Sequence, residues 1–113
     1  MTNQKELARI EYDEIRARLN RKDFLFLSLL AQLDVKQRYV TNISTVLKEP
    51  YRTTLERKRK LEYLELIELE ATTLGYGIDL RKILKLTKKG DKLLEWLTVD
   101  IEKEKIMEKR GNG

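Results

Sequence analysis

The chain of 113 residues contains no cysteine, no histidine, one proline and five glycines. Without cysteine there is no disulfide framework, no zinc–thiolate site and no thiol nucleophile. Without histidine there is no Ser-His-Asp triad and no imidazole base for neutral pH. The sequence also lacks the glycine motifs that bind nucleotide phosphates. Residues 56–58 have the E-x-K spacing of a metal-dependent nuclease, but they lie in a helical segment. We therefore expect no enzyme activity, no metal ion and no cofactor.

A long apolar run is absent as well. The longest stretch, residues 24–31, is interrupted by Ser28, and it falls short of the roughly 20 residues that cross a bilayer. Residues 1–19 alternate charged and apolar side chains, unlike a signal peptide. Hydrophobic residues still make up 41% of the chain, enough for one core. We expect a single domain over 1–113 that is soluble, cytoplasmic and independent of membranes, with nucleoid association as an option.

Charge is abundant and unevenly placed. Charged residues make up 38% of the chain, and the net charge is +5. Residues 48–60 carry six basic and two acidic side chains, residues 61–80 carry five acidic and no basic ones, and residues 81–92 carry six basic and one acidic. A polyanion such as DNA would meet both basic segments only if the fold brings them together. Two solvated basic faces are the alternative.

Apolar spacing and capping residues predict the order of the elements. Asp23 and Thr41 are expected to cap the second and third helices, and Thr87 the last one. Pro50 disfavours helix in the residue before it and suits the first turn of the next helix. A short helix therefore meets a longer basic one across a tight turn, which is helix-turn-helix geometry. The expected elements are helices at 3–20 and 24–33, a short strand at 35–40, helices at 41–49 and 51–64, strands at 67–73 and 82–86, and a helix at 88–109.

Faces of three of these helices follow from the same spacing. The helix at 24–33 is apolar nearly all round, so we expect it to be the most buried. The helix at 41–49 should turn Ile43, Val46 and Leu47 to the core. In the helix at 51–64 the expected core residues are Thr54, Leu61 and Leu64. Leu55 lies partly outward in this phasing, where it either contacts a thymine methyl or packs after a rotation of the helix, and we favour packing.

Two motifs carry a resemblance to a known family. The segment Leu61-Glu62-Tyr63-Leu64-Glu65-Leu66-Ile67 is similar to a leucine-rich exit from a recognition helix, with Glu65 where that family has glycine, so the helix is expected to continue further. Leu86-Thr87-Lys88-Lys89-Gly90 matches the L-T-x-x-G that closes a wing. Residues 23–97 thus resemble the winged helix-turn-helix domain of MarR-type and PadR-type transcriptional regulators. The resemblance implies a mostly α fold with a small β-hairpin, a winged-helix core at 23–87, and additional N- and C-terminal helices at 1–20 and 88–109.

The helix at 51–64 would then enter the major groove of double-stranded DNA. Arginine offers a planar fork for guanine, and threonine can contact a base edge or a phosphate. Basic residues of the returning strand and of the last helix would bind phosphates, which helix N-termini also attract. The candidate DNA-binding residues are Tyr51, Arg52, Thr53, Glu56, Arg57, Arg59, Lys60, Arg81, Lys82, Lys88 and Lys89.

The first and last helices carry more apolar surface than one small core needs. Helix-turn-helix proteins commonly bind two half-sites as two-fold dimers. Leu93, Leu94, Leu97 and Ile101 can complete the core, which leaves a second stripe on the last helix. Folding of the first helix onto its own chain is the alternative to a homodimer. The candidate dimer residues are Ala8, Tyr12, Ile15, Leu19, Trp96, Val99, Ile106 and Met107.

The sequence therefore predicts a transcriptional regulator that binds double-stranded DNA as a homodimer. Two other functions stay open. An architectural DNA-binding protein of low specificity would use the same fold and would show a steep salt dependence. A winged-helix protein-interaction module would suit the acidic strand at 67–73.

Overall fold

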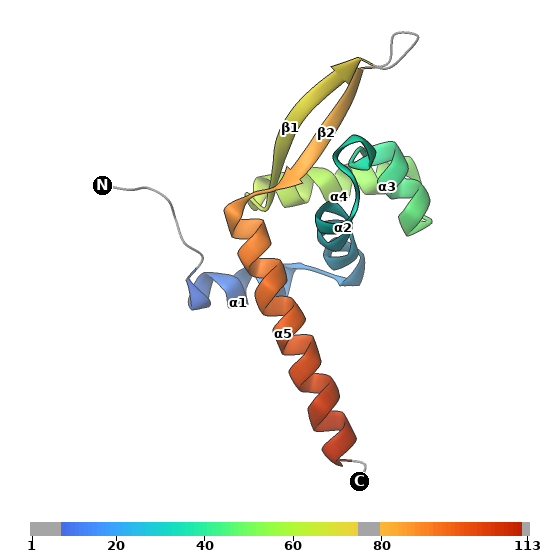
Figure 1. The fold of residues 1–113 in the computed structure, drawn as a ribbon. Coiled ribbons are helices and arrows are strands. Elements are labelled where there is room, and N and C mark those ends of the chain that lie inside the picture. The colour runs from blue at the N-terminus through green and yellow to red at the C-terminus, as the bar shows by residue number, and fades with distance from the viewer. Residues whose placement is uncertain (1–7, 75–79, 112–113) are drawn as a thin grey trace, which may run out of the picture.

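The computed structural model describes the backbone of residues 8–74 and 80–111, and the side chains of residues 8–70 and 82–105. These residues are mostly helical, with one antiparallel hairpin, as expected (Figure 1). No helix in the described ranges is both long enough and apolar enough to cross a membrane. The elements are α1 (Arg9–Arg18), α2 (Arg21–Gln32), the short 3₁₀ helix η1 (Val35–Gln37), α3 (Val40–Leu47), α4 (Tyr51–Tyr63), β1 (Ile67–Leu74), β2 (Leu80–Leu86) and α5 (Lys88–Gly111).

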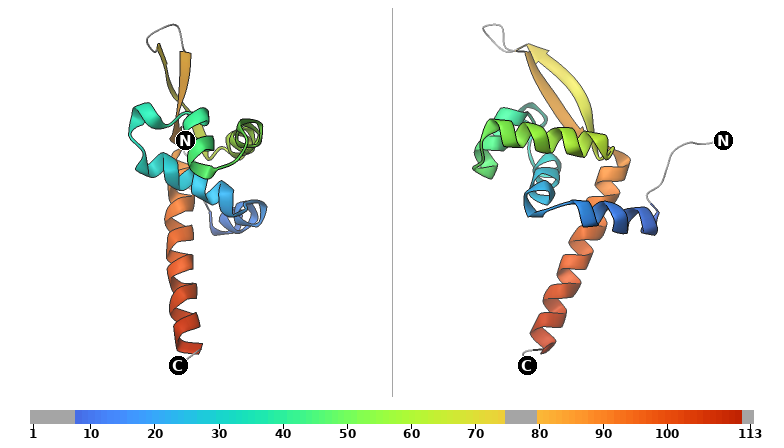
Figure 2. Two further views of the ribbon diagram at one scale, coloured as in Figure 1. Left: turned by 90° about the vertical axis from the view of Figure 1, so that its right-hand side faces the viewer. Right: turned by 180° about the vertical axis from the view of Figure 1, so that it is seen from behind.

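Helices α2, α3 and α4 form a compact group from which the hairpin and α5 extend in opposite directions (Figures 1 and 2). Helix α1 crosses the N-terminal half of α5, and the C-terminal half of α5 extends away from the rest of the protein. Helix α2 lies at the centre, because Phe26, Leu27 and Leu30 are at most 2% exposed. The core around them contains Tyr12, Ile15, Ile43, Leu47, Leu61, Leu66, Ile67, Leu84, Leu93, Leu94 and Leu97.

The start of α2 differs from the expectation that Asp23 is its cap. Asn20 is the N-cap: its side chain accepts a hydrogen bond from the backbone amide of Asp23, and the Asp23 carboxylate accepts one from the amide of Asn20, both at 2.9 Å. This reciprocal pair is a capping box, which satisfies two amides that the first turn leaves without helical partners. Asp23 therefore lies inside the helix, and its carboxylate faces the protein interior.

The prediction of a short strand at 35–40 is wrong. The backbone there turns into η1, closed by hydrogen bonds from Gln37 to Asp34 and from Arg38 to Val35. One strand-like contact survives, a 2.9 Å hydrogen bond from the amide of Leu84 in β2 to the carbonyl of Arg38. The segment is too tightly turned to continue this pairing as a ladder.

The first and third helices also differ from expectation. The described part of the first helix runs over Arg9–Arg18. The third begins at Val40 without a side-chain cap from Thr41, and Val46 is 47% exposed. Ser44 takes the expected place of Val46 in the interior, which is tolerated because its hydroxyl donates to the Thr41 carbonyl at 2.8 Å.

The T-x-x-G motif joins the end of α4, the hairpin and α5. As predicted, Thr87 caps α5: its hydroxyl oxygen accepts a hydrogen bond from the Gly90 amide at 2.9 Å and donates to the Glu65 carbonyl at 2.7 Å. The Thr87 amide donates to the carbonyl of Leu66 at 3.0 Å. The expectation that the helix continues past Glu65 is wrong. Helix α4 ends at Tyr63, because Glu65 adopts a left-handed backbone with φ of 63°. The chain then enters β1, where Ile67 pairs with Leu86.

Candidate nucleic-acid interface

Helix α4 has one buried and one open face. Thr54 and Leu61 are fully buried, and Leu64 packs partly buried against the core, as their spacing predicted. Within the described residues, Arg52 and Arg59 make no side-chain hydrogen bond or ion pair, so both guanidinium groups are available. Seen from behind, α4 lies in front of α2 and below the hairpin (Figure 2). The exposed residues of this helix are Tyr51, Arg52, Thr53, Glu56, Arg59 and Tyr63.

Leu55 is half-buried in a groove of about 280 Å³ between α3, α4 and β2. It packs there instead of facing outward, in line with the favoured alternative. Lys58 is only 14% exposed and pairs with Glu62 at 3.0 Å. The groove combines apolar walls with two ammonium groups at its edge. Its lining residues are Tyr39, Val40, Thr41, Tyr51, Leu55, Lys58 and Lys82.

Arg57 does not lie on the open face. Its side chain is 9% exposed and turns inward toward the start of α2 and the turn between α3 and α4. The guanidinium donates to both carboxylate oxygens of Glu49, at 3.0 and 2.9 Å, and also to Asp23 and, at 2.9 Å, to the side chain of Asn20. These hydrogen bonds engage both edges of the buried guanidinium, so it is not available to a base or phosphate while they are intact. The interpretation of Arg57 as a DNA contact is therefore revised to a structural role.

The two carboxylates around Arg57 are buried and ionised. Burial raises the pKa of Asp23, but hydrogen bonds from Lys60, from the Asn20 amide and from Arg57 lower it more, so it lies below its usual range. Hydrogen bonds from Arg57 lower the pKa of Glu49 more than burial raises it. Charge-assisted hydrogen bonds of this kind are short and strong. Together with Asn20, these residues form the α2–α4 ion cluster, which consists of Asn20, Asp23, Glu49, Arg57 and Lys60.

The second basic segment is divided by the fold. Lys82 and Lys88 are exposed, and neither makes an ion pair within the described part of the chain. Lys89 is 14% exposed and pairs with Glu11 of α1 at 3.0 Å. Lys60 is 38% exposed and donates to Asp23 at 2.6 Å, so it is shared between the surface and the α2–α4 ion cluster. The side chain of Arg81 lies outside the described residues.

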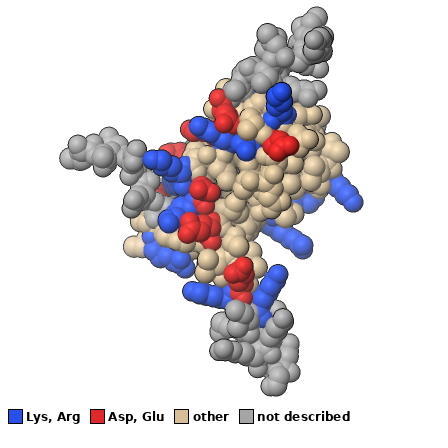
Figure 3. Space-filling model, in the orientation of Figure 1, with Lys and Arg blue, Asp and Glu red and all other residues tan. Residues whose placement is uncertain are grey.

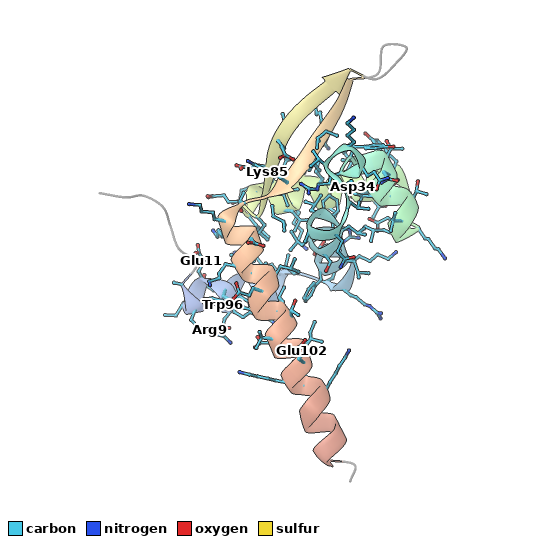
Figure 4. The ribbon with its side chains drawn as sticks, in the orientation of Figure 1. Arg9, Glu11, Asp34, Lys85, Trp96 and Glu102 are labelled. Atoms are coloured by element: carbon cyan, nitrogen blue, oxygen red, sulfur yellow. The ribbon has the colours of Figure 1, made fainter. Side chains whose placement is uncertain are left out.

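The expected dimer face of α1 is buried within its own chain. Tyr12 is 0% and Ile15 5% exposed, and the Tyr12 ring packs edge-on against Trp96 of α5 at 5.1 Å between ring centroids. The Tyr12 hydroxyl donates to Asp100 at 2.7 Å, and Arg16 donates to the same carboxylate at 2.9 Å. Figure 4 shows this crossing, with Arg9, Glu11 and Trp96 labelled. The structure thus has the alternative in which α1 folds onto its own α5.

The remaining candidate dimer residues are divided. Leu19 packs partly buried against the core, and Ala8 is exposed. Val99 is 43% exposed on α5, and the side chains of Ile106 and Met107 lie outside the described residues. Beside this part of α5 a mainly apolar groove of about 360 Å³ separates it from α2, with Phe24, Leu25 and Ile101 in its walls.

On the face shown in Figure 3, basic and acidic side chains alternate over α1 and the start of α5.

Solved structures with a similar fold include MepR and MarR. The MepR–DNA complex from Staphylococcus aureus has a TM-score of 0.66 at 19% identity, over 88% of this chain and 76% of that chain. MepR described as a transcription regulator of the multidrug efflux pump MepA has a TM-score of 0.60 at 21% identity, over 88% and 73%. S. aureus MarR in complex with salicylate and kanamycin has a TM-score of 0.66 at 23% identity, over 86% and 61%.

The chain has a winged-helix fold. Its hairpin is the wing, and α3 and α4 are its helix-turn-helix, in the arrangement of MepR and MarR. At these identities the likeness shows the fold. No protein-family model matches the sequence, and no curated protein matches it significantly. The fold expected from the two motifs is therefore confirmed by the winged-helix structures.

Sequence reasoning missed the acidic half of the α2–α4 ion cluster. The sequence pattern marks Glu49 only as the end of a helix, yet Glu49 accepts two hydrogen bonds from Arg57 and a third from Thr54 at 2.8 Å. One signal was available for Asp23: a polar residue followed three positions later by an acidic one, as in Asn20-x-x-Asp23, is the spacing of a capping box. No local signal places Arg57 against these carboxylates, because they belong to other elements.

Proposed function

We propose that the protein is a transcription regulator whose helix α4 reads the major groove of double-stranded DNA. The observation that carries the proposal is the open face of α4, where Arg52 and Arg59 have no protein partner within the described residues. A planar guanidinium can donate two hydrogen bonds to guanine O6 and N7. Thr53 lies on the same face and can contact a base edge or a phosphate. The fold is also that of MepR, which is bound to DNA in two of the similar structures.

Phosphate contacts would come from the exposed lysines around this face. Lys82 on the wing and Lys88 at the start of α5 have free ammonium groups among the described residues. Lys88 also lies in the first turn of a helix, where the helix dipole favours an anion. Tyr51, Glu56 and Lys60 complete the proposed α4 contacts, and Arg81 the wing contacts. Lys89 is engaged by Glu11, so its proposed contact requires that pair to open.

We further propose that the regulator acts as a homodimer held by the outer surface of α5. A single recognition helix spans few base pairs, and a two-fold dimer reads two half-sites. Val99 is 43% exposed on α5, and an apolar groove lies between α2 and α5. The C-terminal half of α5 extends away from the rest of the protein (Figure 1). Apolar surface of this kind is typical of interfaces. The α1 face with Tyr12 and Ile15 packs against α5 of its own chain and orients that helix. Other residues of α5 would then make the contact with the partner chain.

Selection of bound duplexes from a random DNA pool, with the full chain, tests this function. We expect an enriched sequence with two half-sites about 34–36 Å apart, one helical turn. A gel shift of the enriched duplex against a scrambled one, with and without Mg²⁺, separates binding from cleavage. Equal binding to both, with a steep salt dependence, would favour an architectural protein. Absence of binding would favour a protein-interaction module, and light scattering gives the oligomeric state of the same sample.

A further inference from the structure

We propose that Asp23, Glu49 and Arg57 are positioning residues that orient α4 for sequence-specific binding without touching DNA themselves. The inference rests on the proposed function and adds specificity determinants to it. Two of the three are acidic, and one belongs to the basic run of α4. All three side chains are buried, at 1%, 3% and 9% exposure respectively.

The geometry of Arg57 ties α4 to two other elements at once. One edge of its guanidinium binds both oxygens of Glu49, which precedes α4 in the turn after α3. The remaining nitrogen binds Asp23 and Asn20 at the start of α2. Asp23 is itself held by the Asn20 amide at 2.9 Å. A planar fork engaged on both edges admits a single orientation, because each hydrogen bond depends on direction as well as distance.

The apolar contacts of α4 do not supply this precision by themselves. Thr54 and Leu61 are its fully buried residues, and Leu55 and Leu64 are partly buried, but hydrophobic attraction has no direction. Rolling a helix by about 10° moves atoms at its rim by roughly 1 Å, since a helix with side chains is 10–12 Å across. A shift of that size breaks a bidentate contact to a base. Arg59 lies about 200° around the helix from Arg57, so locking the inner residue also locks the direction of the outer one.

The sign of one effect distinguishes positioning from simple electrostatics. Removing a carboxylate near a DNA-binding face reduces repulsion of phosphates, so simple electrostatics predicts tighter binding to every sequence. Positioning predicts the opposite for the preferred sequence and little change for others. Nonspecific binding depends on phosphate contacts, which tolerate small shifts better than base contacts do.

The experiment compares Asp23→Asn, Glu49→Gln and Arg57→Lys with the parent chain on the selected duplex and on a scrambled duplex. Asp23→Asn and Glu49→Gln keep nearly the same shape, whereas Arg57→Lys keeps the charge but loses the planar fork. We expect the ratio of specific to nonspecific affinity to fall by roughly 5- to 150-fold, the value of one well-aligned bidentate contact. Nonspecific affinity and the slope of log K against log salt should stay unchanged. Asp13→Asn, which removes a carboxylate 65% exposed on α1, is the matched control and should leave the ratio unchanged.

Circular dichroism and thermal unfolding identify the variants that are folded at the assay temperature. If a carboxylate variant is unfolded there, Arg57→Lys is the variant that tests the inference. An unchanged or increased specificity ratio in the folded variants would overturn the inference. A further variant, Arg57→Met, removes the positive charge. If it is folded and its slope of log K against log salt falls by about 1, the inference is also overturned, because that slope counts phosphate contacts. If the parent chain binds no duplex, the proposed function itself fails, whereas binding by the parent with unaltered variants rejects only the positioning role.

Discussion

Gly90 lies directly against the carbonyl oxygen of Leu66. A Cβ at position 90 would be 2.0 Å from that oxygen and 2.9 Å from the carbonyl carbon, both of them backbone atoms that cannot rotate away. The first turn of α5 therefore approaches the start of the wing more closely than any side chain permits. This contact explains why the last residue of the T-x-x-G motif is glycine, while Thr87 supplies the hydrogen bonds of the same joint.

Gly90→Ala should therefore destabilise the fold. On helix propensity alone the change would stabilise α5 by about 1 kcal/mol. The clash reverses the sign, and we expect a loss of about 1–3 kcal/mol, as for other overpacked sites. Urea unfolding monitored by circular dichroism measures it. Lys92→Ala, at an exposed site on the same helix, should change stability by less than about 0.5 kcal/mol. A more stable Gly90→Ala variant would contradict the close approach.

Glu65→Gly should stabilise the protein by about 1 kcal/mol. Glu65 has φ of 63°, a left-handed conformation that costs a residue with a Cβ about 1–2 kcal/mol and costs glycine little. Its side chain is exposed and makes no hydrogen bond or ion pair within the described residues. Glu56→Gly, an exposed site inside α4, is the control and should destabilise by about 1 kcal/mol. Thermal melts of both variants give the two signs, and equal losses would contradict the argument.

Stability should fall in acid through Asp23 and Glu49. Their pKa values are lowered in the folded protein, so the folded state binds fewer protons than the unfolded one in this range. The stabilisation is complete above their ordinary pKa values of about 4 and is lost as the pH falls through the lower folded values. Unfolding free energies from pH 7 to pH 2 should decline less steeply in Asp23→Asn than in the parent. Equal slopes in the two proteins would argue against ionised carboxylates in the α2–α4 ion cluster.

Stability should also fall in alkali through Tyr12. Burial, with the hydrogen bond to Asp100 next in importance, raises the pKa of Tyr12 to about 12. The unfolded chain loses this proton at about pH 10, so stabilisation is complete below pH 10 and is lost as the pH rises toward 12. The decline should be smaller in Tyr12→Phe, which keeps the ring but has no proton to lose. Tyr63→Phe, at a ring 81% exposed, is the matched control and should behave like the parent.

Arg59→Ala and Lys88→Ala should weaken DNA binding in different ways. Loss of a bidentate base contact at Arg59 should cost about 1–3 kcal/mol on the preferred duplex and relax the sequence preference. Loss of a phosphate contact at Lys88 should weaken binding equally on all duplexes and lower the salt slope by about 1. Fluorescence anisotropy across a salt series measures both. Lys36→Ala, at an exposed lysine of η1, is the control, and unaltered binding in both test variants would favour a protein partner.

The sequence by itself determined most of the elements and the joint between the hairpin and α5, although not η1 or the N-cap of α2. Helical spacing located α4 to within a residue of its end, and L-T-x-x-G located the end of the hairpin and the cap of α5. These features depend on local chemistry: the period of apolar residues, a threonine that caps a helix, and a proline that begins one. The core residues Thr54 and Leu61 followed from the same period and are confirmed as buried.

Only the tertiary structure decided where flanking residues point. Arg57 lies beside the core face of α4, and its inward turn depends on Asp23, 34 positions away in the sequence. Likewise, the apolar pattern of α1 is compatible with packing against its own α5 and with packing against a partner chain. The hydrogen bond from Tyr12 to Asp100, which joins residues 88 positions apart, shows that α1 packs against its own α5. A charged or aromatic side chain at the edge of a helix face has several directions of similar local energy. The carboxylate or ring that a distant segment brings beside it selects one of them.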